Sequence, residues 1–209
     1  MADNYLENRM EELKASRPKI VRNHTSLDTL LKRNRSFRGY DSAVPVTREM
    51  LLEMVSVATL VPSGMNAQAL RFRLVDSTEA HLIHPLIKLG AALPEEHLPH
   101  PGEEPQGYIV ICGARPEDKV LDIDLGIAAQ SILLKAVDMG LSGIVILNFN
   151  AARVKEALKL HLEPLAVIGL GKGTERIFLM PAHQGDSLKY YRKDGVHYVP
   201  KLVIEDLVL

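Results

Sequence analysis

The stretch Leu125-Gly-Ile-Ala-Ala-Gln-Ser-Ile-Leu-Leu134 contains ten consecutive residues without a formal charge, between two β-branched runs at 106–114 and 141–147. A helix that is apolar nearly all round has to be covered on all sides. The two flanking runs are bounded by Gly or Pro and have the composition of buried strands. This stretch therefore predicts a helix in the core, with a second subunit covering the face that a chain this short leaves open.

Helices and strands alternate irregularly on either side of this core, which predicts an α+β fold rather than a doubly wound sheet. Helices are expected over 4–16, from Ser26 to the arginines at 33–38, and over 47–61, 78–93 and 151–160. Further strands are expected at 70–75 and 165–170. Residues 94–105 contain four prolines and are expected to form an extended, exposed loop. We find no linker, and expect one domain over 1–209, with a helical arm over 1–25 and an extended tail over 180–209.

Composition excludes several classes of protein. The 209 residues are 46% hydrophobic, enough for a full core, and the net charge of −1 argues against bulk electrostatic binding to nucleic acid or an anionic membrane. The first residues are polar and no apolar run approaches the roughly 18 residues of a membrane span, so we expect a cytoplasmic protein. Cys112 is the single cysteine and is interpreted as a buried structural thiol rather than a nucleophile.

Three arginines and a serine stand within the six residues Arg33-Asn-Arg-Ser-Phe-Arg38. Guanidinium groups offer a fork of N–H donors that matches phosphate oxygens, and the hydroxyl of Ser36 adds another donor. The alternative is a solvated basic helix end, because the helix dipole stabilises cations near a C-terminus. The segment therefore predicts either a local phosphate site or an ordinary helix terminus.

The loop Pro62-Ser-Gly-Met-Asn-Ala-Gln68 is rich in residues that bend the backbone and present hydrogen-bonding groups. Asn66 and Gln68 each supply a donor and an acceptor, as the edge of a planar heterocycle requires, and the alternative is a loop that satisfies its own backbone. No Gly-x-Ser-x-Gly elbow surrounds Ser63, the glycines at 169–173 lack a dinucleotide fingerprint, and the eight histidines form no metal-ligand pattern. We therefore predict no catalytic side chain and no metal site.

Four motifs, taken in order, resemble the FMN-dependent nitroreductase family. They are the Arg-Ser-Phe-Arg segment at 35–38, Pro-Ser-Gly-x-Asn-x-Gln at 62–68, Asp-x-Gly-x-Ala-x-Gln at 124–130 and Val-Pro-Lys at 199–201. The resemblance covers residues 26–205. The chain departs from the family at Asn34, where a second arginine is usual, at Ala69-Leu70 in place of Pro-Trp, and at Leu202 in place of a basic residue.

The resemblance implies an α/β sandwich with a central mixed or antiparallel sheet flanked by helices, assembled as an intertwined homodimer with FMN at the subunit interface. It implies that Arg35, Ser36 and Arg38 hold the phosphate and ribityl end, with Lys201 as a second phosphate cation. Arg33 is expected to reach in for the arginine missing at position 34. The flavin ring is expected to be bordered by the other subunit's loop and by the backbone after the strand at 141–147, that is by Pro62, Ser63, Gly64, Asn66, Gln68, Leu147 and Asn148.

The resemblance also implies an activity. NADH or NADPH would deliver hydride to flavin N5 and leave, and a nitroaromatic, quinone or similar acceptor would then be reduced in a ping-pong cycle. One alternative is a flavin-binding protein without nicotinamide-dependent turnover, and another is a phosphate or nucleotide sensor that uses only the arginine clamp. Residues 81–105 are expected to carry the groups that select the acceptor, and their prolines and histidines form either a lid or an inert surface loop.

Overall fold

The computed structural model describes residues 25–209, so the expected helical arm lies outside the described residues. The α-helices are α2 (Leu27–Arg33), α3 (Arg48–Ser56), α4 (Lys119–Asp138) and α5 (Ala151–Ala157). The strands are β1 (Leu70–Val75), β2 (Gly107–Gly113), β3 (Ser142–Ile146), β4 (Glu163–Gly171), β5 (Arg176–Ala182), β6 (Tyr191–Lys193) and β7 (Val196–Leu202). Within residues 25–209, none of the helices combines the length and apolar content that crossing a membrane would need.

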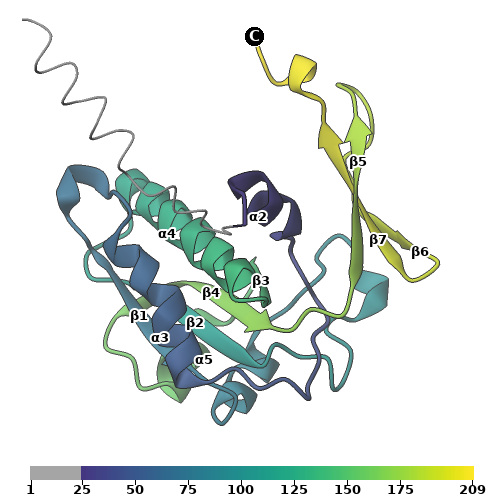
Figure 1. Ribbon diagram of the computed structural model, residues 1–209. Coiled ribbons are helices and arrows are strands. Elements are labelled where there is room, and N and C mark those ends of the chain that lie inside the picture. The colour runs from purple at the N-terminus through teal and green to yellow at the C-terminus, as the bar shows by residue number, and fades with distance from the viewer. Residues whose placement is uncertain (1–24) are drawn as a thin grey trace, which may run out of the picture.

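The strands form two sheets. The larger one has the order β1-β2-β4-β3 and is antiparallel throughout, with α3 and α4 on one face (Figure 1). The smaller one has the order β5-β7-β6, in which β5 and β7 run parallel and β6 and β7 antiparallel. Figure 1 shows this smaller sheet projecting from the body beside α2. Helices packed on antiparallel and mixed sheets confirm the expected α+β class.

Both faces of the larger sheet are buried, because successive side chains of a strand point to opposite faces. On β2, Ile109 and Ile111 join the hydrophobic cluster under α3 and α4, whereas Tyr108, Val110 and Cys112 join the cluster on the face that α5 covers. Burial raises the pKa of the Cys112 thiol to about 11. Cys112 is 3% exposed, so the expected burial of this thiol is confirmed.

The expected starts of α2 and α3 are confirmed by their caps. The Ser26 hydroxyl accepts a hydrogen bond from the Thr29 backbone N–H at 3.3 Å, and the Thr47 hydroxyl accepts one from the Met50 N–H at 3.4 Å. Each cap satisfies one of the N–H groups that the first turn of a helix leaves without a partner. α2 ends at Arg33, so residues 34–38, here called the arginine segment, follow the helix as irregular chain.

The expected helix over 78–93 is wrong. The structure has two short 3-10 turns there, Ala80–Leu82 and His84–Leu86, followed by extended chain. Pro85 lies inside the second of these turns and has no N–H to donate, so the α-helical hydrogen-bond pattern is broken there. The segment instead packs over the second face of the sheet through the fully buried Ile83.

Two other expectations need correction. The loop 94–105 is not exposed throughout, because Leu98 and Pro105 are buried. The tail 180–209 is more than an extended segment. It contains β6, β7 and the end of β5, and these strands pair with one another. The sequence does not reveal which strands pair, because the hydrogen bonds between paired strands are made by backbone groups that nearly every residue carries.

One face of α4 is left uncovered by the other residues of 25–209. Ala128, Ile132 and Ala136 are buried against the sheet, whereas Ile123 is 54% exposed. A Cβ added to Gly126 would meet nothing within 4 Å. Around Ile123, this helix therefore presents an apolar side chain that the described residues do not bury.

Candidate functional site

A hollow of about 350 Å³, here called the anion pocket, lies between the chain after α2, the helix α4, the strand β3 and the smaller sheet. The residues that line it are Asn34, Arg35, Ser36, Arg38, Gln130, Leu133, Gly143, Val145, Ile177, Tyr190, His197, Val199 and Lys201. It brings the arginine segment together with Lys201, although these lie far apart in the sequence.

The arginine segment is held beside β3 by a close backbone approach. Ser36 forms a parallel bridge with Gly143, and the Phe37 N–H donates to the Gly143 carbonyl at 3.3 Å. A Cβ on Gly143 would stand 2.6 Å from Leu133 Cδ2 and 2.9 Å from the Gly169 carbonyl oxygen. Glycine is therefore required at 143, because the Gly169 carbonyl belongs to the paired backbone of β4, which cannot give way as a side chain can.

A carboxylate fixes the turn that carries Arg38. The Glu175 side chain accepts hydrogen bonds from the backbone N–H groups of Arg38 and Gly39, and it pairs with the guanidinium of Arg192 on β6. Arg192 also lies 3.5 Å from the Glu96 carboxylate. The start of the pocket is thus tied to the smaller sheet by an ion-pair network, which orients Arg38 through its main chain.

The side chain of Arg38 is 7% exposed and contacts three groups. Its Nη1 donates to the Ser36 carbonyl at 2.9 Å and lies 3.5 Å from His197 Nε2. Its guanidinium carbon stands 4.7 Å from the centre of the Tyr190 ring, within the range of cation–π attraction. The Nε atoms of Arg38 and Arg35 are buried and have no hydrogen-bond partner among residues 25–209.

His197 lies at the back of the pocket and is 3% exposed. Burial first of all, and then the positive charges of Arg38 and Arg192, lower the pKa of its imidazole to about 4. The ring is therefore neutral at pH 7. Its Nδ1 is buried without a partner in the described part of the chain.

The donor set of the anion pocket fits a phosphate group. Arg35, Arg38 and Lys201 supply positive charge, and Ser36 supplies a hydroxyl. None of the described side chains that line the hollow is acidic. Buried guanidinium N–H groups without partners are costly, and an anion bound beside them would satisfy them.

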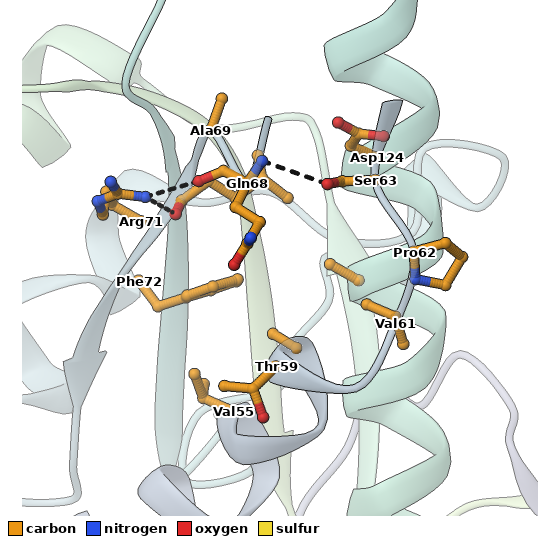
Figure 2. A pocket seen from close by; sticks show the side chains of 13 residues that line it. Val55, Thr59, Val61, Pro62, Ser63, Gln68, Ala69, Arg71, Phe72 and Asp124 are labelled. Carbon is orange, nitrogen blue, oxygen red and sulfur yellow. Dashed lines mark hydrogen bonds between the residues drawn. The ribbon is translucent and has the colours of Figure 1, made fainter. Parts of the chain in front are cut away.

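The loop 62–68 lines a different hollow, of about 290 Å³, between α3, β1 and α4. Figure 2 shows Pro62, Ser63 and Gln68 on its rim with Asp124 behind the loop. The Gly64 N–H donates to Asp124 Oδ1 at 2.8 Å, whereas Asp124 Oδ2 is buried without a partner among the described residues. The hollow is lined mainly by apolar side chains, so we call it the loop pocket.

The loop is strained and partly satisfies itself. Met65, Asn66 and Gln68 have φ angles of 52°, 52° and 46°, a left-handed region that side chains other than glycine rarely adopt. The Gln68 N–H donates to the Ser63 hydroxyl at 3.2 Å, and the Gln68 side chain donates to Asn66 Oδ1 at 3.1 Å. Such strain persists only where the surroundings impose it and is typical of functional loops.

The remaining predicted site residues lie outside both pockets. Arg33 lines a neighbouring hollow with Lys32. Leu147 is exposed directly after β3, and the Asn148 carbonyl accepts from the Lys88 N–H at 2.9 Å. A single chain therefore separates the predicted flavin contacts instead of gathering them. Over residues 25–209, no group of three or more His, Cys, Asp or Glu side chains is arranged to hold a metal ion.

Sequence reasoning missed Tyr190, Glu175 and His197. One signal was available for the last of these. His197 and Lys201 are four positions apart in a β-strand, and residues at i, i+2 and i+4 line one face of a strand. Because side chains alternate between the two faces of a strand, the assignment of Lys201 to a phosphate also places His197 on the phosphate-binding face.

The family profile named "Nitroreductase family" matches residues 31–172. The match takes in the arginine segment, the loop 62–68, α4 and the four strands of the larger sheet. Fold and site thus define a nitroreductase-type architecture. This chain belongs to the nitroreductase family.

Individual relatives agree with this assignment. YdgI of Bacillus subtilis (strain 168), named as a candidate NAD(P)H nitroreductase, is 44% identical over 50 residues, which span 24% of this chain and 24% of that relative's length. A nitroreductase family protein of Clostridium novyi NT is 25% identical, with a TM-score of 0.58 over 72% of this chain and 86% of its own. A candidate nitroreductase of Exiguobacterium sibiricum 255-15, solved in complex with FMN, is 20% identical, with a TM-score of 0.58 over 74% of this chain and 91% of its own.

Proposed function

We propose that this protein is an FMN-dependent NAD(P)H oxidoreductase that reduces nitroaromatics, quinones or similar acceptors. The observation that carries the proposal is the anion pocket, where Arg35, Arg38 and Lys201 meet around donors without partners. Support also comes from the FMN bound to the Exiguobacterium sibiricum relative and from NAD(P)H in the name of the Bacillus subtilis relative.

The chain's own residues would bind and orient the cofactor. Ser36 and the cations of the anion pocket hold the phosphate, and β3 leads from Gly143 in that pocket to Leu147 and Asn148, whose backbone borders the ring. When bound, FMN supplies hydride acceptance and donation at its ring system. Since the flavin carries the chemistry, no acidic or basic side chain is assigned a catalytic role.

We further propose that the working form is a homodimer in which the loop 62–68 of one chain covers the ring bound by the other. Three observations support this arrangement. The loop pocket and the anion pocket are separate hollows lined by different residues of one chain. The described residues leave the apolar face of α4 around Ile123 uncovered, and Met65 at the tip of the loop is almost fully exposed.

An absorbance spectrum of the purified protein, taken before and after incubation with FMN, tests the proposal. We expect a flavin spectrum that bleaches when NADH or NADPH is added without oxygen and returns when a quinone is added. A protein that stays colourless after reconstitution would contradict FMN binding. If neither NADH nor NADPH bleaches the flavin spectrum, the result supports the alternative of a flavin-binding protein without nicotinamide-dependent turnover.

A further inference from the structure

We propose that His197 is a positioning residue of the anion pocket, whose imidazole accepts a hydrogen bond from Arg38 and so fixes the guanidinium that binds the flavin phosphate. The inference rests on the proposed function, because it assigns the phosphate to FMN. His197 is not assigned a contact with the flavin ring or with the acceptor.

The contacts around Arg38 determine the plane of its guanidinium. Nη1 is shared between the Ser36 carbonyl at 2.9 Å and His197 Nε2 at 3.5 Å. The Tyr190 ring packs against Arg38 and His197. Its centre lies 4.7 Å from the guanidinium carbon of Arg38 and 5.1 Å from the centre of the imidazole. A long side chain that would otherwise be mobile is thereby held from two sides, which reduces the entropy lost when an anion binds.

The arrangement requires a neutral imidazole. Only an unprotonated Nε2 can accept from Arg38, so the proton of the neutral ring belongs on Nδ1. The positive charges around the ring favour this neutral state. They are carried by Arg38, from the segment after α2, and by Arg192, from β6. The carboxylate of Glu175 binds the main chain of Arg38 and the side chain of Arg192.

The position of His197 on β7 links it to the second cation of the pocket. His197, Val199 and Lys201 all line the hollow from one strand. Fixing the strand against Arg38 therefore also sets the distance between Lys201 and the arginine segment. A side chain of the same size that cannot accept a hydrogen bond would leave Arg38 free to turn away from the phosphate.

Comparing FMN with riboflavin isolates the phosphate contribution. Dissociation constants are measured by quenching of flavin fluorescence for the full-length protein and for three variants, His197→Leu, His197→Gln and His183→Gln. His183 is an exposed histidine after β5 and serves as the matched control. We expect His197→Leu to weaken FMN binding by about tenfold or more, as loss of a hydrogen bond to a charged group implies, and to leave riboflavin binding unchanged. His197→Gln keeps an acceptor and should retain most of the FMN affinity.

Equal weakening of FMN and riboflavin in His197→Leu would overturn the inference, because a purely structural defect does not distinguish the two flavins. Unchanged FMN binding in that variant would also overturn it. If the unaltered protein takes up neither flavin, the proposed function itself is wrong. Nitrogen-15 NMR of the unaltered protein at pH 7 gives a test that needs no flavin and no variant: we expect the proton on Nδ1 of His197, and a proton on Nε2 would contradict the hydrogen bond.

Discussion

Lys201 lines the anion pocket with an exposed side chain, so it can be removed without opening a cavity in the core. We expect Lys201→Ala to lose a charge-assisted hydrogen bond to the FMN phosphate, worth roughly 1.5–3 kcal/mol. This corresponds to a dissociation constant raised by about ten- to a hundredfold. Equilibrium titration with FMN measures it.

The control for this prediction is Lys193→Ala, which removes an exposed lysine from β6, outside the anion pocket. Both variants change the net charge equally, so a general electrostatic effect would weaken both alike. A loss of affinity confined to Lys201→Ala supports direct phosphate binding, and an unchanged titration in that variant would count against it.

His197 gives the protein a predictable dependence on pH. Its pKa is lowered from 6.5 to about 4 in the folded state, so between these values the unfolded chain binds a proton that the folded chain does not. Stability from this residue is therefore fully present above about pH 6.5 and falls as the pH drops towards 4. Urea unfolding of the flavin-free protein at pH 7 and pH 5 measures it.

The comparison protein is His197→Gln, which keeps a polar side chain of similar length but does not titrate. All other ionisable groups are shared, so their contributions cancel. We expect the unaltered protein to lose more stability than the variant between pH 7 and pH 5. Parallel losses in the two proteins would show that the histidine is not held neutral by the fold.

At the scale of elements, the contact between the loop 62–68 and α4 depends on glycine. A Cβ on Gly64 would stand 2.2 Å from Val120 Cγ1, a separation that no packed structure tolerates. We expect Gly64→Ala to displace the loop and to destabilise the protein by about 1–3 kcal/mol, as overpacking does. Thermal unfolding of the single variant measures this loss.

A double variant identifies the cause of the loss. Val120→Ala removes the clashing methyl group, so Gly64→Ala combined with Val120→Ala should recover much of the stability that Gly64→Ala loses. The coupling energy of this cycle isolates the contact between the two positions. Simple additivity of the two single changes would mean that the loop is not seated on α4 in the way described.

How far the sequence predicted the elements depended on whether the deciding interaction was local. The caps at Ser26 and Thr47 were predictable, because a cap and its partner lie within one turn. The helix expected over 78–93 failed because Pro85 outweighed the apolar spacing. The pairing of β5 with β7 was missed, since a parallel ladder is made by backbone groups and leaves little trace in the sequence.

The candidate site shows the same division. The arginine segment and Lys201 were assigned to one phosphate through the family resemblance, and the structure places Arg35, Ser36, Arg38 and Lys201 around one hollow. Glu175 and Tyr190 orient Arg38 from the chain next to the strands of the smaller sheet, and no spacing in the sequence foretold them, whereas His197 shares a strand face with Lys201. Gly143 was likewise unrecognised, because its need for a bare backbone arises from the packing of Leu133 on α4 and of the Gly169 carbonyl on β4.

At the scale of the whole molecule, the exposed face of α4 predicts the consequence of an interface substitution. Ile123→Glu would place a carboxylate in the interface of the proposed homodimer, where burying an unpaired charge is costly. We expect the variant to sediment as a monomer and to lose FMN, because each ring would then lack the loop of the other chain. Analytical ultracentrifugation and the flavin absorbance measure the two effects.

Leu52→Glu is the matched control, since Leu52 is also on a helix and is 53% exposed, compared with 54% for Ile123. A change that merely adds charge to an exposed apolar position would affect both variants alike. Retention of the dimer by Ile123→Glu would mean that the subunits meet elsewhere on the molecule.

The contact between Arg38 and His197 joins positions 159 residues apart. Ribosomes add about 5–20 residues per second, so the two halves of the anion pocket leave the ribosome roughly 8 to 32 seconds apart. The arginine segment therefore spends that interval as a free basic stretch, and a nascent chain has nowhere to hold a phosphate. Under the proposed function, FMN can therefore be bound only after β7 has been synthesised, because the pocket is incomplete until then.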